Sequence, residues 1–567
     1  MATVLEILQE RLQNALQTVG VSLDEVPQLA PTDEPRFGDY QSNVALVLGK
    51  RLRENPRKLA TRIVEPLLAH GSEFSAEVAG PGFINFRISP GFVAEQLLRV
   101  ALDERLGVQR VKHERTIVID FSSPNIAKPM HVGHIRSTIL GDVLARVARR
   151  IGHRVITDNH LGDWGTQFGK VIYGWKHLVN PPDLKADPAL ELVRVYREAD
   201  DLAKKNTEVL RACRAELLKL QQGDQENQQI WQQCVDISRQ EFGKIYDLLD
   251  IRFDHELGES HYNAQLPGVV GKLLDKGVVE LSEGAIVYWD RSLSEDPFII
   301  QKSDGGFGYA ATDVATLEYR IQHWHPDAIW YVVGAPQSLH FRQLFSLARR
   351  VGYGIELEHI AFGSILGEDR KLMRTRSGES VPLRDLQREA VSRAETIVAE
   401  KNPQFDQNDR AAIGRIVGLG AIKYAELSQH RMSDYIFSWD KLLSLHGNTA
   451  PYLQNAYVRS RAIFRKLEVP FTMPASIELG DDPEIALAKK MLHFPDVVPA
   501  ILDGFKPNIL ANYLYELAAQ FHGFYESCPV LTAEGGRRET RLLLCDVFAR
   551  LLRSGLELLG IQVPEKM

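Results

Sequence analysis

The segment IVIDFSSPNIAKPMHVGHIRSTILGD, Ile117 to Asp142, places two histidines around a glycine where one periodic pattern stops and another starts. Ile117 to Ile119 form a short apolar run typical of a buried strand. Apolar residues then recur at helical spacing from Ile135 to Val147, and HRVITDNHL begins a second strand-like run. This strand–helix–strand order predicts the first half of a parallel, nucleotide-binding type of sheet.

The turn in this segment ends at a helix N-terminus, where free N–H groups and the positive end of the helix dipole favour an anion. Neither a P-loop nor a G-x-G-x-x-G fingerprint is present there. Gly133 permits close approach of a flat group, and His131 and His134 can direct ring N–H donors at phosphate oxygens. The pattern therefore predicts an ATP-like site. Two ordinary histidines are the plainer alternative, and zinc lacks a third ligand of suitable spacing.

Working outward, the patterns predict an α/β protein of several domains. A small α+β unit is expected at 1–112, since the turn residues of GPG precede the alternating strand pattern FINFRI. A Rossmann-like catalytic domain with a parallel sheet follows at 113–385, interrupted by a charged, leucine-spaced helical insertion at about 176–290. The remaining ranges are helix-periodic and are expected to form a stem and an all-α C-terminal domain, 386–440 and 441–567.

Composition excludes several classes of protein. The 567 residues hold 67 basic and 74 acidic side chains, a net charge of -7, so any RNA must be bound through local basic surfaces. The four cysteines are scattered without a C-x-x-C, and we expect buried thiols rather than disulfides or a metal site. No apolar run reaches the length of a membrane span and the N-terminus reads as an amphipathic helix, so a cytoplasmic location without membrane contact is expected.

SSPNIAKPMHVGHIRSTILGD resembles the HIGH signature of class I aminoacyl-tRNA synthetases, and its flanks resemble those of arginyl-tRNA synthetases. Further similar blocks are DNHLGDWGTQFG, YAATDVATLEYR, YVVGAPQSLHFRQLF, GNTAPYLQNAYVRSR and the terminal LGIQVPEKM, so the resemblance spans the chain. It implies ATP-dependent activation of L-arginine to arginyl-adenylate and transfer to the 3' end of tRNA(Arg), with release of AMP and pyrophosphate. It further implies ATP with Mg²⁺ as a substrate complex, no tightly bound cofactor or metal, a monomer without an obligate protein partner, and tRNA binding before activation.

The arginine pocket should carry acceptors, because a guanidinium is a planar fork of donors. Asp120, Asn125, Tyr309, Asp313 and Gln337 are acceptor-bearing groups at strand ends or on an adjoining helix. The resemblance implies that Tyr309 and Asp313 hold the guanidinium. It implies that the amino acid and its ammonium contact a second set: Asp120, Ser122, Asn125, His131 and Gln337.

The resemblance also implies an ATP site made by the first signature and one methionine of a second loop: Pro124, Asn125, Lys128, His131, Gly133, His134 and Met373. That second loop departs from the family pattern Lys-Met-Ser-Lys-Ser, since it reads LMRTRSG with Thr375 at the second lysine position. Lys128 is the family's expected replacement, and Lys371, Arg374 and Arg376 are further candidates. We expect these cations, with His131 and His134, to act electrostatically and without a covalent nucleophile.

The tRNA-binding surface is expected in the helical C-terminal part. PYLQNAYVRSRAIFRK mixes basic and aromatic residues without an acid, which can contact phosphates and stack bases. A packed core face with solvated arginines is an equal alternative from the pattern alone, and the resemblance favours RNA. The residues expected to contact tRNA are Phe37, Asn43, Tyr452, Tyr457, Arg459, Arg461 and Met567.

Two other functions fit parts of the sequence. A non-catalytic RNA-binding paralogue is consistent with the altered second loop, although the intact histidines, Asp313 and Gln337 argue against it. A nucleotidyltransferase acting on another substrate would lack paired acids, whereas Asp120 and Asp313 are both present.

Overall fold

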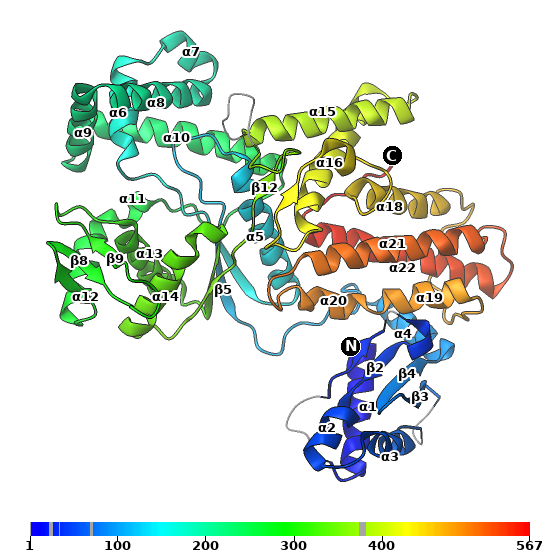
Figure 1. The fold of residues 1–567 in the computed structure, drawn as a ribbon. Helices are drawn as coiled ribbons and strands as arrows, with labels where there is room; N and C mark the ends of the chain where they lie inside the picture. Colours follow the sequence, from blue (N-terminus) through cyan, green and yellow to red (C-terminus); the bar gives the residue numbers. More distant parts are fainter. Residues whose placement is uncertain (1, 22–26, 33, 69–71, 374–380) are drawn as a thin grey trace.

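The computed structural model describes residues 2–21, 27–32, 34–68, 72–373 and 381–567, and Figure 1 shows their arrangement. A central sheet of four parallel strands has the order β11-β10-β5-β6. The strands are β5 (Thr116–Phe121), β6 (Arg154–Asp158), β10 (Ala328–Val332) and β11 (Glu356–His359). The predicted α/β fold with a parallel sheet is confirmed.

Two connections position the site. Helix α5 (Val132–Arg150) follows β5 and leads to β6, whereas α14 (Ser338–Val351) follows β10 and leads to β11 on the other side. The chain therefore leaves the adjacent strands β5 and β10 in opposite directions. The carboxyl ends of these two strands form a topological switch point, where open α/β sheets bind ligands.

Side chains of β5 alternate between two cores, as the period of a strand requires. Ile117, Ile119 and Phe121 belong to the core that includes α5, and Val118 belongs to the core beneath α13 (Tyr309–Trp324) and α14. Gly141 of α5 lies directly against the Phe121 ring, since an added Cβ there would meet that ring at 2.2 Å. This close packing holds the middle of α5 against the end of β5.

The insertion between β6 and β10 is only partly helical. Helices make up its first part: α6 (Gln167–His177), α7 (Pro181–Ala186), α8 (Pro188–Lys205), α9 (Thr207–Gln221), α10 (Gln225–Leu248), α11 (Glu259–Tyr262), η2 (Asn263–Gln265) and α12 (Leu266–Asp275). A three-stranded antiparallel sheet follows: β7 (Glu280–Ser282), β8 (Ala285–Tyr288) and β9 (Phe298–Gln301). The expectation of a helical insertion up to about residue 290 is corrected here, because β-branched residues around the turn at Gly284 form a hairpin.

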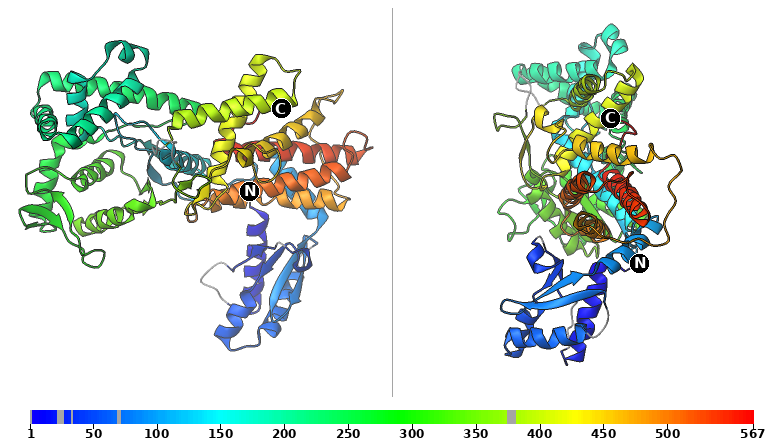
Figure 2. Two further views of the ribbon diagram at one scale, coloured as in Figure 1. Left: turned by 45° about the horizontal axis from the view of Figure 1, so that its top comes forward. Right: turned by 90° about the vertical axis from the view of Figure 1, so that its right-hand side faces the viewer.

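The N-terminal unit projects from the body of the molecule, as Figure 2 shows. Its elements are α1 (Val4–Thr18), β1 (Ala30–Pro31), η1 (Pro35–Phe37), β2 (Tyr40–Ser42), α2 (Val44–Leu52), α3 (Pro56–Leu68), β3 (Phe74–Ala79), β4 (Phe83–Ile88) and α4 (Pro90–Leu102). The strands pair antiparallel in the order β1-β2-β4-β3. Lys489 joins the unit to the C-terminal helices through an ion pair with Asp39 at 2.7 Å.

The C-terminal part of the fold is helical. A short parallel pair, β12 (Ile365–Leu366) and β13 (Tyr435–Ile436), connects it to the catalytic domain. Its other elements are α15 (Leu383–Lys401), α16 (Gln407–Leu427), α17 (Trp439–Leu442), α18 (Ala450–Phe464), α19 (Asp482–Met491), α20 (Phe494–Ala500), α21 (Asn508–Ser527) and α22 (Gly536–Leu558). In the catalytic domain, the short helix η3 (Ala335–Gln337) lies between β10 and α14. Among the described residues, no helix is both long enough and apolar enough to cross a membrane.

Candidate functional site

The loop that follows β5, residues 122–131 and called the signature loop below, has a strained backbone. Ser122 (φ 74), Ser123 (φ 48) and Ala127 (φ 61) occupy the left-handed region. Residues with a side chain seldom adopt this region, and such strain concentrates at ligand sites. The Ala127 N–H donates to Ser238 Oγ of α10 at 3.1 Å, so the helical insertion holds the loop in place.

His131 and His134 cap the N-terminus of α5. The Gly133 N–H donates to His131 Nδ1 at 3.1 Å, and the His131 N–H donates to His134 Nδ1 at 3.1 Å. An accepting ring nitrogen carries no proton, so each neutral ring holds its proton on Nε2. The helix cap thereby fixes both rings as Nε2–H donors.

Both rings are neutral at pH 7. Burial, together with the charge of Lys128, lowers the pKa of His131. Burial and the neighbouring His131 lower the pKa of His134 to about 3. The ring centroids lie 4.1 Å apart. The pair can therefore offer hydrogen bonds to an anion at the positive end of the helix, and it has no spare basic nitrogen for proton abstraction.

The neighbours of the pair leave room on the solvent side. Gly133 is exposed, and a Cβ there would lie 2.9 Å from His131 Cε1, so only glycine preserves the cap. Lys128 is exposed with Nζ 5.8 Å from the Tyr196 ring centroid, and no described acid pairs with it. The signature loop is also bonded to the segment after β6, because the Pro124 carbonyl accepts the Gly162 N–H at 3.1 Å. Asn125 lies against Gly162, where an added Cβ would meet its Oδ1 at 2.3 Å.

A cluster of two acids and one tyrosine, called the acid pocket below, lies near the start of α13: Asp313, Glu259 and Tyr309. Tyr309 and Asp313 are four residues apart and share one helix face. Asp313 Oδ2 lies 2.5 Å from His340 Nε2 of α14. Glu259 begins α11, and its burial, followed by the charges of Asp313 and Asp163, raises its pKa to about 8. This pocket holds two acids and an exposed tyrosine ring, which suits a cation.

Asp120 faces inward, away from solvent. Arg320 of α13 is fully buried and donates from Nη2 to Asp120 Oδ2 at 2.6 Å and to Asp158 Oδ2 at 2.7 Å. Ser123 Oγ donates to Asp120 Oδ1 at 3.0 Å. Asp120 is therefore paired with a cation of the chain itself. From the sequence, we expected it to be an accessible acceptor for the amino acid.

The remaining predicted arginine contacts differ in accessibility. The Ser122 hydroxyl is buried and bonded to the Thr138 and Tyr246 hydroxyls, each at 2.8 Å, which contradicts a side-chain contact with substrate. Gln337 is exposed at the end of η3, shortly after β10, and Asn125 is half-buried in the signature loop. These two amides remain available.

Part of the second loop is described. Met373 is half-buried against the main core, and its N–H donates to the Ile365 carbonyl at 3.2 Å. Lys371 is exposed. Arg374 and Arg376 lie outside the described residues. The chain after them pairs with the signature loop, since the Val132 N–H donates to the Val381 carbonyl at 2.9 Å and the Leu383 N–H donates to the Met130 carbonyl at 2.8 Å. The two loops therefore meet at the start of α5.

The predicted tRNA-binding residues of α18 separate into two sets. Tyr457 is only 3% exposed and packs in the helical core, so the expectation that it stacks on a base is wrong. Tyr452 and Arg459 face α21 at the surface. The Tyr452 hydroxyl lies 2.8 Å from His522 Nδ1, and the Arg459 guanidinium lies 5.0 Å from the Tyr525 ring centroid. Arg461 pairs with an acid, Asp546, at 3.3 Å. Met567 is half-buried against the core.

The two predicted contacts of the N-terminal unit share a cavity of about 660 Å³. Phe37 and Asn43 line it together with Gln41, and the Asn43 Oδ1 atom is buried without a hydrogen-bond partner among the described residues. An orphaned acceptor beside an aromatic ring fits a ligand that carries a donor and a flat face.

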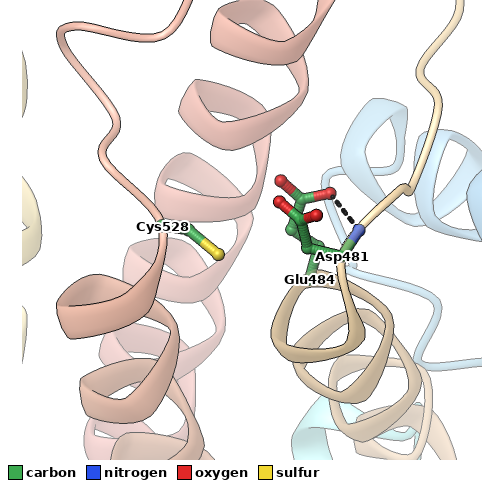
Figure 3. A group of neighbouring side chains, drawn as sticks. All are labelled: Asp481, Glu484 and Cys528. Carbon is green, nitrogen blue, oxygen red and sulfur yellow. Dashed lines mark hydrogen bonds between the residues drawn. The ribbon is translucent and has the colours of Figure 1, made fainter.

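Asp481, Glu484 and Cys528 approach one another closely enough to resemble a metal site (Figure 3). The positive charge that a metal ion would supply comes from Arg541, because its guanidinium donates to Glu484 Oε1 and Asp481 Oδ2, each at 2.7 Å. Burial opposes ionisation of Glu484, yet the bonds from Arg541 and from backbone N–H groups lower its pKa. The cluster is an internal ion-pair network. All four cysteines are buried, as predicted.

Several residues of the site had no distinctive sequence pattern. Glu259 lies in a loop-like stretch, LGESHY, and Arg320 lies on a helix whose other face is apolar. His340 has a retrospective signal, since it follows Gln337 by three residues and one helical turn places both on the same side. Gln41 and the α21 aromatics were likewise undetectable without the fold.

Comparisons with known proteins cover nearly the whole chain. Residues 6–88 match the arginyl tRNA synthetase N-terminal domain, residues 96–439 match the catalytic domain of class I (R) tRNA synthetases, and residues 453–567 match the DALR anticodon binding domain. The chain is 43% identical to an arginine–tRNA ligase of Cellvibrio japonicus, with 99% of each chain covered. It is 45% identical to one from Synechococcus, with 100% of each covered. The arginyl-tRNA synthetase structure of Plasmodium falciparum superimposes with a TM-score of 0.86 at 31% identity, covering 100% of both chains.

Proposed function

The chain belongs to the arginyl-tRNA synthetase family of class I aminoacyl-tRNA synthetases, and from this premise we propose how its residues divide the work. The protein is an arginine–tRNA ligase, which activates L-arginine with ATP and transfers it to the 3' end of tRNA(Arg). Its use of ATP follows from this class of ligase. Two observations support the residue assignment: the Nε2–H donor pair at the start of α5, and the neighbouring acids Asp313 and Glu259 on α13 and α11.

The signature loop binds ATP in this proposal. His131 and His134 donate Nε2–H bonds to phosphate oxygens, Gly133 leaves space for the nucleotide, and Lys128 brings an unpaired positive charge. Pro124, Asn125 and Met373 complete the ATP site. As arginine's carboxylate attacks the α-phosphorus, charge grows on phosphate oxygens, and preorganised donors stabilise that charge. Mg²⁺ enters with the pyrophosphate part of ATP.

The cation that replaces the missing loop lysine is Lys128 in this proposal. It lies on the signature loop itself, whereas the other candidate cations, Lys371, Arg374 and Arg376, belong to the second loop. Lysine is a compact point charge that suits a phosphate, and arginine is not an equivalent replacement.

The acid pocket binds the arginine side chain. Asp313 and Glu259 accept from the guanidinium, and Tyr309 adds its hydroxyl oxygen. Gln337, Asn125 and His131 surround the amino acid end. Asp120 has an indirect role in this proposal: it accepts hydrogen bonds from Arg320 and Ser123 and so positions these two residues.

Two surfaces bind tRNA(Arg) in this proposal. The cavity with Phe37 and Asn43 takes a base at the corner of the tRNA. Tyr452 and Arg459, with the α21 aromatics, take the anticodon loop by stacking and phosphate contact. Arg461 contributes charge near the same surface, and Met567 supports it from the core.

We further propose a cytoplasmic monomer that binds tRNA before it activates arginine. Aminoacylated tRNA is consumed by translation in the cytoplasm. A requirement for tRNA predicts that arginine-dependent ATP–pyrophosphate exchange is slow without tRNA.

The test is charging of a total tRNA pool with each labelled amino acid, with and without ATP, by the wild type and by Lys128→Ala. We expect ATP-dependent charging with arginine alone. We expect Lys128→Ala to lower kcat roughly 100- to 1,000-fold, the range for loss of one preorganised donor, while tRNA binding persists. Lys401→Ala, which removes an exposed lysine at the end of α15, is the matched control and should charge normally. Charging by neither protein, with tRNA bound by both, would instead indicate a non-catalytic RNA-binding protein.

A further inference from the structure

His340 is the only described side chain that forms a hydrogen bond or an ion pair with Asp313. The two groups lie 2.5 Å apart on different helices, α14 and α13, and each side chain is 26% exposed. The His340 ring is wedged edge-on between Phe298 and Phe341, with centroid distances of 5.1 and 5.6 Å. This packing leaves the ring little freedom, so Nε2 is held at the carboxylate.

The direction of the bond follows from its acceptor. An ionised carboxylate can only accept, so Nε2 donates whether the imidazole is neutral or charged. One carboxylate oxygen, Oδ1, has no bond from a described residue and is left for a ligand.

The start of helix α14 carries two groups that we assign to the arginine site. Gln337 immediately precedes α14 and His340 lies in its first turn, three residues later. Gln337 is exposed, while His340 reaches Asp313. The same turn therefore carries one group for the amino acid end of arginine and one group that fixes the acid for its guanidinium.

We propose that His340 is a positioning residue for specificity: by donating to Asp313 Oδ2 it holds that carboxylate in one orientation with Oδ1 left for the ligand, and so favours a charged guanidinium over a neutral isostere. This inference rests on the proposed role of Asp313 in binding arginine. A neutral isostere such as citrulline carries a urea in place of the guanidinium, so it gains less from an ionised carboxylate.

The experiment measures steady-state aminoacylation and the inhibition constant of citrulline for His340→Ala, His340→Gln, Asp313→Asn and the double variant His340→Ala with Asp313→Asn. We expect His340→Ala to raise the arginine KM about 10- to 100-fold, as for loss of a hydrogen bond to a charged group, with kcat within about twofold. The citrulline constant should change much less. His340→Gln places an amide N–H near the Nε2 position and should recover part of the loss, and it also serves if His340→Ala unfolds.

The double variant separates positioning from structural damage. With Asp313 replaced there is no carboxylate to orient, so His340→Ala should add little in the Asp313→Asn background. Ser346→Ala is the control on the same helix, because it removes hydrogen bonds to Tyr288 and Asp290 away from the pocket and should leave KM unchanged.

Two outcomes overturn the inference in different ways. An unchanged KM in His340→Ala, or an equal loss with and without Asp313, removes the role of His340 alone. An unchanged KM in Asp313→Asn removes the assignment of the arginine pocket as well.

Discussion

Arg320 and the pocket at Asp313 are two environments for a guanidinium group within one domain. Arg320 is fully buried between Asp120 and Asp158, at the ends of β5 and β6. Asp313 and Glu259 lie at the entrance of α13 and α11, and no described arginine or lysine pairs with either. The chain itself fills the first environment and leaves the second for a ligand.

The charge states of the two environments differ accordingly. Burial alone would lower the pKa of Arg320, but the two carboxylates raise it well above its usual value, so it is a permanent cation. In the open pocket, burial and the charge of Asp313 raise the pKa of Glu259 to about 8. Without a ligand, Glu259 therefore keeps its proton at pH 7. A bound guanidinium supplies the positive charge that allows both carboxylates to be ionised. Pocket occupancy and protonation are coupled only in the open environment.

The largest effect is expected from emptying the filled environment. Arg320→Ala leaves two buried carboxylates without their cation, and removal of one partner from a buried ion network costs about 3–5 kcal/mol. Urea unfolding followed by circular dichroism should show this loss in the free energy of unfolding. Arg320→Lys retains the charge without the fork of donors and should lose less. If the free energy of unfolding of Arg320→Ala changed by less than about 1 kcal/mol, Asp120 and Asp158 would take up protons at little cost. The ion pairs of Arg320 would then not stabilise the fold.

This comparison also shows what could be predicted from sequence. The strand–turn–helix at Ile117 to Asp142 was predictable because its apolar periods are local, and the parallel sheet follows from it. The two histidines were predictable as anion donors, but the reason is the reciprocal cap in which each Nδ1 accepts a backbone N–H, and that depends on rotamers. The assignment of Tyr309 and Asp313 came from the resemblance and still awaits a test.

The misplaced residues share one physical cause, which is that burial is not local. Asp120 was expected to be open because it ends a strand, yet Arg320, 200 residues later, neutralises it. Tyr457 was expected to stack on RNA because basic residues surround it in sequence, yet helical period turns it into the core. Residues 280–290 were expected to belong to a helical insertion, yet they contain the paired strands β7 and β8. Long-range partners decide all three.

The second prediction concerns protonation of the open pocket. A guanidinium binds an ionised Glu259 better than a protonated one, so below pH 8 arginine binding must release a proton. The dissociation constant for arginine should therefore fall as pH rises from 6 to 8, by at most about tenfold per pH unit. Calorimetry in buffers of different ionisation enthalpy should detect the released proton directly.

Glu259→Gln is the control for this prediction, because an amide cannot titrate. It should bind arginine more weakly at pH 8 and show no proton release. Its stability should also depend less on pH between about 4.5 and 8, because the wild-type acid with its raised pKa favours the folded state below about 4.5 and this contribution is lost as the pH rises to about 8. Wild-type binding that is independent of pH between 6 and 8 would mean that Glu259 is not at the guanidinium.

The smallest effect is expected from the tyrosines that accompany each environment. Tyr331 is buried with its ring centroid 5.5 Å from the Arg320 guanidinium carbon, whereas Tyr309 is 73% exposed beside the open pocket. Tyr309→Phe removes one acceptor that competes with water, so the arginine KM should rise only about 2- to 10-fold, from a hydrogen bond of about 0.5–1.5 kcal/mol. Stability should not change, because nothing buried is lost. If Tyr309→Phe and Tyr309→Ala both bind arginine as the wild type does, the exposed ring does not close over the guanidinium and the open pocket is defined by its two acids alone.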